Sequence, residues 1–314
     1  MLANILYIVC GLVLLPLGAQ GLVRGSTGLA LRMGVTALVI GLTVIAFGTG
    51  SPEFVLSIEA ARAGNGGIAL GNIVGSNIAN LTLVIGLAAL VKPMTVRSAL
   101  VRREMPLMIG VTLLLCAMLL DGRLSRPEGL LLVVGAVGYT VFTYLAARHG
   151  ETKEVVAEFD DALSGPRRSV QFDFGLLSAG LVALLVGAHL LLRGATAIAA
   201  DLGISQVVIG LTIVAVGTSL PELATSVTSA LRGEVDVAFG NVIGSNILNI
   251  LAVLGVAALI RPFEVQGLRS VDLLVMVVSA VLLLPLMWRG WVLNRWEGLM
   301  LLTGYVAYMY SLVK

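Results

Sequence analysis

The chain of 314 residues repeats one set of polar motifs at a constant spacing of 169 residues. The sequence GTGSPE at 48–53 returns as GTSLPE at 217–222, and GNIVGSNIAN at 71–80 returns as GNVIGSNILN at 240–249. About 38 of the 80 residues from 11 to 90 are identical to their partners. A carboxylate within membrane-spanning sequence is costly and marks a functional site. Its duplication favours a transporter built from internal repeats.

Composition restricts the chain to a membrane protein. Hydrophobic residues make up 58% of the chain and charged residues 12%, unlike the balance in a soluble domain. Apolar stretches of about 20 residues match a hydrocarbon core of about 30 Å, and strand-type alternation is missing from the sequence. We therefore expect ten helical spans at 3–22, 36–61, 68–91, 106–120, 129–147, 174–192, 206–231, 237–260, 273–287 and 298–313.

Five spans in each half predict two halves of opposite orientation, because an odd number of crossings returns the chain on the other side. The expected fold is an all-α membrane protein with ten transmembrane helices in two inverted-topology repeats of five. The expected divisions are a first half at 1–149, a polar connector at 150–173 and a second half at 174–314. The first apolar stretch is expected to be a span rather than a signal peptide, because no basic region precedes it.

Basic residues predict the orientation of these spans. Thirteen Lys and Arg residues fall on the side of the connector, and seven fall on the other side. The positive-inside rule places the richer side in the cytoplasm and both termini outside. We expect a multi-pass protein of a plasma membrane or of a bacterial or archaeal inner membrane. The net charge of +2 requires no nucleic-acid partner, and no obligatory protein partner is evident.

The motif around Glu53 predicts a broken helix. Pro52 lacks an N–H group and disrupts the preceding turn, which neighbouring glycines already weaken. We expect unpaired backbone carbonyls near Ala46 and Thr49, which a bound cation would satisfy, with the Ser51 hydroxyl as a further neutral oxygen. The second half repeats the arrangement with Ala215, Thr218, Ser219, Pro221 and Glu222.

The asparagine-rich motifs add oxygen donors near the middle of the next spans, at Ser76, Asn80, Ser245 and Asn249. Two carboxylates among hydroxyl, amide and carbonyl oxygens suit a hard cation, and Ca²⁺ favours such ligands. Soft metals are disfavoured, because the motifs lack Cys, His and Met. The remaining asparagines are interpreted either as packing residues or as part of the site; they are Asn72, Asn77, Asn241 and Asn246.

The paired motifs resemble the alpha repeats of the sodium/calcium exchanger family, within the cation/Ca²⁺ antiporter superfamily, over essentially the whole chain. The resemblance implies a Ca²⁺ site formed by the carboxylates of Glu53 and Glu222 and the backbone carbonyls of Thr49 and Thr218. It implies sodium sites that share these glutamates, one with Ala46, Thr49 and Ser76, the other with Ala215, Thr218, Ser219 and Ser245, while Asn80 and Asn249 line the centre. It also implies that the spans 3–22 and 174–192 are sliding gate helices.

Two positions depart from the family pattern. Gly50 stands where prokaryotic members often have Ser, and the neighbouring Ser51 points about 100° away around a helix. Asn249 stands where Asp is frequent, which resembles potassium-independent exchangers. Both departures bear on ion coupling more than on Ca²⁺ binding.

The expected function is a secondary antiporter that exchanges Na⁺ for Ca²⁺ by alternating access, because both ions compete for the same carboxylates. Ca²⁺ and Na⁺ are the transported ions, and no prosthetic group is expected. The alternatives are Ca²⁺/H⁺ exchange on the same scaffold and a cation channel. An enzyme is not expected, because the site lacks the His and Cys of common nucleophile–base pairs and metal centres.

Overall fold

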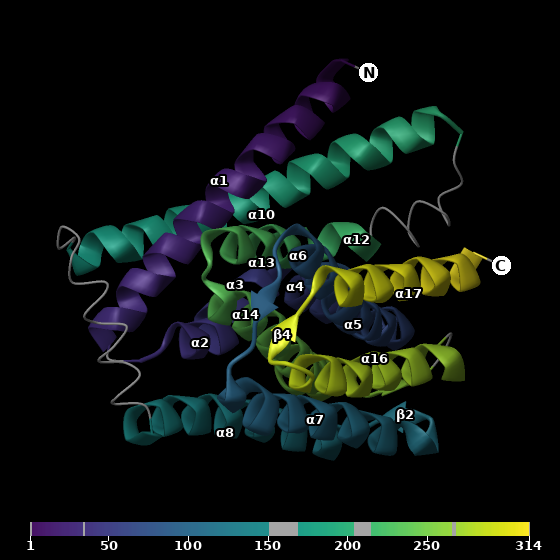
Figure 1. Ribbon diagram of the computed structural model, residues 1–314. Coiled ribbons are helices and arrows are strands. Elements are labelled where there is room, and N and C mark those ends of the chain that lie inside the picture. Colours follow the sequence, from purple (N-terminus) through teal and green to yellow (C-terminus); the bar gives the residue numbers. More distant parts are fainter. Residues whose placement is uncertain (1, 34, 151–168, 204–214, 266–267, 314) are drawn as a thin grey trace.

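The structure is a computed structural model that describes residues 2–33, 35–150, 169–203, 215–265 and 268–313. Apart from short strands, the regular structure in this part of the chain is helical (Figure 1). Seven of the described helices are long and apolar enough to cross a membrane, or eight if one bent pair counts as a span. The all-helical class is confirmed. The expected span 206–231 and the connector 150–173 fall partly outside the described residues.

The elements of the first half cover the expected spans, but α1 continues to Met33, eleven residues beyond the expected end at 22. They are α1 (Leu2–Met33), α2 (Ala37–Ile40), η1 (Gly41–Ile45), α3 (Ala46–Thr49), α4 (Ser51–Arg62), α5 (Gly66–Ala79), η2 (Asn80–Val84), α6 (Ile85–Val91), β1 (Met94–Thr95), η3 (Leu100–Glu104), α7 (Met105–Met118), η4 (Leu119–Asp121), β2 (Arg123–Leu124) and α8 (Arg126–Gly150). Of the η segments, η1, η2 and η3 are π-helical, and η4 is a 3₁₀ turn.

The second half repeats this order as far as it is described. Its elements are α10 (Val170–Asp201), α12 (Ala215–Thr218), α13 (Leu220–Arg232), α14 (Val235–Leu248), the π-helical η6 (Asn249–Leu254), α15 (Gly255–Ile260), β3 (Phe263–Glu264), α16 (Ser270–Trp288), β4 (Val292–Leu293) and α17 (Arg295–Val313).

The two longest helices, α1 and α10, pack against each other above the other helices in Figure 1. Glycines line their contact, so that a Cβ added to Gly180 would lie 2.3 Å from the Leu22 nitrogen. At one end of the pair, Arg32 Nε lies 2.9 Å from Asp173 Oδ2. Small residues allow two membrane helices to approach at backbone distance. The pair, with α2, forms a hydrophobic cluster separate from the main core.

The four short strands interlock the two halves. β1 pairs with β4, with Met94 opposite Leu293, and β2 pairs with β3, with Leu124 opposite Phe263. By the spacing of 169 residues, β1 corresponds to β3 and β2 to β4. Each half therefore pairs its first strand with the second strand of the other half. The main core likewise draws buried side chains from both halves.

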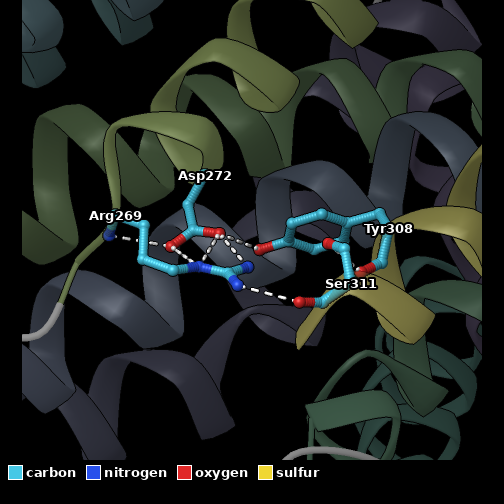
Figure 2. A network of polar contacts seen from close by, with 4 residues as sticks. All are labelled: Arg269, Asp272, Tyr308 and Ser311. Atoms are coloured by element: carbon cyan, nitrogen blue, oxygen red, sulfur yellow. Dashed lines mark hydrogen bonds and ion pairs between the residues drawn. The ribbon is translucent and has the colours of Figure 1, made fainter. Parts of the chain in front are cut away.

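A polar cluster ties the start of α16 to the end of α17 (Figure 2). The Asp272 carboxylate accepts hydrogen bonds from the Arg269 backbone and Nη2, each at 2.9 Å. It also accepts one from the Tyr308 hydroxyl at 3.2 Å, and Arg269 Nη1 donates to the Ser311 carbonyl at 2.9 Å. The cluster pairs a buried carboxylate in the first turn of α16 with a cation, a backbone N–H group and a hydroxyl.

We expect Asp272→Ala to lower the free energy of unfolding by about 2–3 kcal/mol, the cost of losing several hydrogen bonds to one charged group. Tyr308→Phe removes a single donor and should cost about 1 kcal/mol. The measurement is the midpoint of thermal unfolding of the purified protein in detergent. Equal midpoints for Asp272→Ala and Tyr308→Phe would show that the carboxylate does not hold this cluster together.

Candidate functional site

The break in the first half falls at Gly50, where the helix axis bends by 48°. Pro52 and Glu53 both lie in the first turn of α4. A proline is well accommodated there, because the N–H groups of a first turn have no intrahelical partner. Pro221 and Glu222 occupy the same places in α13. Each glutamate thus lies at the positive end of a half-helix, where the helix dipole favours a carboxylate.

The carbonyl group of Ala46 is not left unpaired. It accepts from the Gly50 N–H at 3.1 Å and from the Ser245 hydroxyl at 3.4 Å. The prediction of a carbonyl without an intrahelical partner at Ala46 is therefore wrong. The proline begins the next half-helix instead of disrupting the last turn, so that turn keeps its hydrogen bond. A carbonyl oxygen has two lone pairs, and here the second is directed to the other half of the chain.

The two glutamate side chains lie close enough for their charges to interact, and each residue is 1% exposed. Ser76 donates its hydroxyl to Glu53 Oε1 at 3.4 Å. The side chain of Thr218 also contacts the Glu53 carboxylate, and that of Thr49 contacts the Glu222 carboxylate. The threonine of each half therefore contacts the glutamate of the other half. The structure brings the four residues of the predicted Ca²⁺ site together.

Four predicted ligands have a buried oxygen atom without a hydrogen-bond partner among the described residues. These atoms are Glu53 Oε2, Glu222 Oε2, Asn80 Oδ1 and Ser219 Oγ. Buried polar atoms are normally satisfied, and an unsatisfied buried carboxylate is especially costly. A hard cation such as Ca²⁺ or Na⁺ would satisfy oxygen atoms of this kind. Over the same described residues, no group of three or more His, Cys, Asp or Glu side chains forms an alternative metal site.

Position 50 faces the second half of the chain. A Cβ added to Gly50 would lie 3.7 Å from Asn249 Oδ1 and 3.8 Å from Glu222 Oε1. In the expected sodium sites, apart from the shared glutamates, the ligands of each site came from one half of the chain. In the structure, residues of the two motifs contact each other across the halves. Ser245, for example, contacts Ala46 of the first half. The reason is tertiary: the two breaks face each other, so a side chain at one break meets the motif of the other.

Two further expected ligands have less evident roles. The Ser51 side chain is half-buried, and its hydroxyl donates to the Gly48 carbonyl at the break. Ala215 begins α12, directly after residues 204–214, which the structure does not describe. The hydroxyl of Ser51 is therefore engaged at the bend, and among the described residues no hydrogen bond is found from it to either glutamate.

Asn72 and Asn241 hold the half-helices that carry the glutamates. Asn72 Nδ2 donates to the Glu53 carbonyl, and Asn241 Nδ2 donates to the Glu222 carbonyl, both at 3.4 Å. Each also donates to a serine one turn further along, at 3.0 Å and 3.1 Å. Asn241 Oδ1 accepts from the Thr49 hydroxyl at 3.0 Å. These two asparagines, which the sequence left open, position groups of the candidate site.

Two π-helical turns at the site were not anticipated. η2 begins at Asn80 and η6 begins at Asn249, which are equivalent positions in the two halves. A π turn adds one residue to a helical turn and is frequent at functional sites. The duplicated asparagines marked these positions as polar sites. The spacing of apolar residues, however, does not reveal a one-residue insertion in a helix.

Comparisons with known proteins agree on one family. The sequence model of the family described as sodium/calcium exchanger protein matches residues 3–145 and 172–314. The chain is 41% identical to the putative antiporter CaxA of Alkalimonas amylolytica, over 99% of each chain. It is 38% identical to the inner membrane protein YrbG of Escherichia coli K12, over 98% of this chain and 96% of that one. A solved structure of the sodium-calcium exchanger NCX_Mj, soaked with zero Na⁺ and Ca²⁺, matches with a TM-score of 0.86 and 33% identity over 99% of both chains.

Proposed function

Because the chain belongs to the sodium/calcium exchanger family, we propose that it exchanges Na⁺ for Ca²⁺ across a membrane by alternating access. The chain is an integral, multi-pass membrane protein of the antiporter class and not an enzyme. Na⁺ and Ca²⁺ are the ions transported by this family. An inner or plasma membrane is the proposed location, in keeping with the inner-membrane relative.

The observation that carries the proposal is the pair of buried glutamates, each with one unpartnered oxygen. Together, Glu53 and Glu222 would neutralise one Ca²⁺ ion. The side chains of Thr49 and Thr218 contact these carboxylates from the opposite halves, and the backbone carbonyls of the two threonines would be further ligands. Na⁺ would require the same carboxylates, so the two kinds of ion would bind alternately. That competition would couple the outward movement of one ion to the inward movement of the other.

The inverted arrangement of ten spans is supported by contacts across the two halves. Arg32 pairs with Asp173, at 2.9 Å, and Lys92 Nζ donates to the Leu231 carbonyl at 3.2 Å. Both contacts join helix ends or adjoining residues that the positive-inside rule assigns to the cytoplasmic side. β2 and β3 pair on the side assigned to the exterior. The family match to 3–145 and 172–314, which are offset by 169 residues, supports halves at 1–149 and 174–314 with a connector at 150–173.

The α1–α10 pair is proposed as the gate. A Cβ added to Gly48, beside the first break, would lie 3.2 Å from the Leu181 side chain of α10. A Cβ added to Gly217, beside the second break, would lie 2.6 Å from the Leu192 side chain. One face of α10 thus covers both breaks. Sliding of the pair along this face would uncover the two ends of the site in turn.

The test of the function is ⁴⁵Ca²⁺ uptake into proteoliposomes that hold the purified protein. We expect an outward Na⁺ gradient to drive Ca²⁺ accumulation, and a proton gradient of equal size to drive little. Uptake that follows only the proton gradient would favour Ca²⁺/H⁺ exchange on the same scaffold. Ca²⁺ flux that runs down its own gradient without either counter-ion would indicate a channel.

Gly50→Ser should lower the Na⁺ concentration needed for half-maximal exchange. The new hydroxyl would lie beside Glu222 Oε1 and Asn249 Oδ1, where a Cβ comes within 3.8 Å of both. One additional oxygen ligand is worth about 1–3 kcal/mol, or roughly tenfold to a hundredfold in affinity. Ca²⁺ binding measured without Na⁺ should change little. A weaker sodium response in Gly50→Ser than in the wild type would count against this coupling.

The topology predicts that the connector 150–173 lies in the cytoplasm. Single cysteines placed there should react with impermeant thiol reagents in inside-out vesicles and not in intact cells. Cys10, which is exposed, and Cys116 would first be replaced. Labelling of the connector in intact cells would reverse the predicted orientation.

A further inference from the structure

We propose that Asn77 is a positioning residue that sets which end of the Asn249 amide faces the transported ions. The inference rests on the proposed function, because it concerns the same site. Asn77 is 1% exposed on α5, and Asn249 is 3% exposed at the start of η6. The sequence does not show whether the amide of Asn77 or Asn249 donates or accepts a hydrogen bond at the site. The hydrogen bonds between the two halves show which end of each amide faces which partner.

A backbone carbonyl anchors the arrangement. Asn77 Nδ2 donates to the carbonyl oxygen of Asn246 at 3.3 Å. A carbonyl oxygen accepts hydrogen bonds and does not donate them, so the nitrogen of the Asn77 amide must face it. The oxygen of the same amide must then face the opposite way. The backbone of the second half thus fixes the orientation of a side chain from the first half.

The second hydrogen bond passes this orientation to Asn249. Asn77 Oδ1 accepts from Asn249 Nδ2 at 3.1 Å. Because the Asn249 nitrogen is engaged there, its oxygen points away from Asn77. That oxygen lies 3.7 Å from the place of a Cβ on Gly50, and Glu222 Oε1 lies 3.8 Å from the same point. Asn249 therefore presents an acceptor, and not a donor, beside one of the two glutamates.

The orientation matters because a cation is bound by oxygen atoms. The amide nitrogen carries two hydrogens and would oppose a cation if the amide turned over. Residues behind the direct ligands commonly orient them, and their loss weakens metal binding without removing a ligand. Asn77 would act in this way, since it contacts Asn249 and neither of the glutamates is among its hydrogen-bond partners in the described structure.

The other half does not repeat this arrangement among the described residues. Asn246 is the equivalent of Asn77 and is equally buried, at 1% exposure. Its Nδ2 donates to the Val242 carbonyl of its own helix at 2.7 Å, and its Oδ1, like that of Asn80, has no hydrogen-bond partner in the described part of the chain. The orienting hydrogen bond from Asn249 to Asn77 thus has no counterpart between Asn80 and Asn246.

The experiment is a double-mutant cycle on equilibrium binding of ⁴⁵Ca²⁺ to the purified full-length protein in Na⁺-free detergent solution. We expect Asn77→Leu to raise the Ca²⁺ concentration for half-saturation about tenfold, as for the loss of one hydrogen bond at a charged site. In an Asn249→Ala background, Asn77→Leu should have no further effect, because the amide that it orients is gone.

Equal losses from Asn77→Leu in both backgrounds would show a merely structural role and overturn the inference. Thermal unfolding midpoints identify variants that fail to fold, and Asn77→Ser, which is too short to span both partners, replaces Asn77→Leu in that case. Na⁺-driven uptake by the wild type tests the proposed function separately. If the wild type binds Ca²⁺ but shows no Na⁺-driven uptake, the proposed exchange is wrong, and the double-mutant cycle still decides the role of Asn77. If the wild type binds no Ca²⁺, both proposals are wrong.

Discussion

Glu53→Gln and Glu222→Gln should each reduce Na⁺-driven Ca²⁺ uptake to less than about one hundredth of the wild-type rate. Each substitution keeps the size of the side chain and removes one of the two charges that would balance Ca²⁺. Both carboxylates are buried, at 1% exposure, and each has an oxygen that no described residue satisfies. Removal of one partner from a buried charge pair costs about 3–5 kcal/mol, which is more than a hundredfold in affinity. The measurements are ⁴⁵Ca²⁺ uptake in proteoliposomes and ⁴⁵Ca²⁺ binding in detergent.

Glu59→Gln is the matched control for this prediction. Glu59 lies on the same half-helix as Glu53, but it is exposed, and its equivalent in the second half is Thr228. Its replacement should leave uptake within about twofold, because its exposed side chain is not part of the buried pair. Both buried variants should still insert and purify, since glutamine fills the same volume. Wild-type uptake by Glu53→Gln or Glu222→Gln would refute the assignment of the site.

Gly180→Val should abolish most transport and lower the thermal unfolding midpoint. A Cβ at Gly180 would lie 2.3 Å from the Leu22 nitrogen and 2.7 Å from the Gly18 carbonyl oxygen. Both are backbone atoms, so no side chain can turn aside, and α1 and α10 would have to separate. Overpacking of this kind costs about 1–3 kcal/mol or more. A separated pair would also lose its fit over the two breaks, so we expect uptake to fall at least about tenfold.

Gly175→Val, on the same helix, is the matched control. A Cβ there meets no atom within 4 Å, and the residue is exposed. Both substitutions place a β-branched residue in α10 and therefore share the same change in helix propensity. Gly175→Val should retain both uptake and stability. If the two variants behaved alike, the close contact between α1 and α10 would not be what limits transport.

Much of the candidate site could be predicted from the sequence, because membrane-spanning sequence makes polar residues conspicuous. A glutamate such as Glu53 is energetically costly in an apolar span, so its presence there indicates a function. A second glutamate at a spacing of 169 residues indicates a paired site. The helical class followed from apolar length, since backbone groups in lipid must be satisfied within each segment. These inferences depend on composition, length and repetition, which are properties of the chain itself.

What only the tertiary structure decided was how the two motifs face each other. The decisive contacts join residues more than 150 positions apart in the sequence. They are the hydrogen bond of Ser245 to Ala46, the approach of Gly50 to Glu222 and the hydrogen bond between Asn249 and Asn77. Local sequence patterns do not predict such contacts, because the direction of a side chain depends on the orientation of its helix. It also depends on one-residue insertions such as the π-helical turn that begins at Asn249. The duplicated sequence determined which residues would meet in the interior of the membrane protein. The packing of one half against the other determined which atom of each residue faces the candidate site, because hydrogen bonds between the halves orient the amides and hydroxyls.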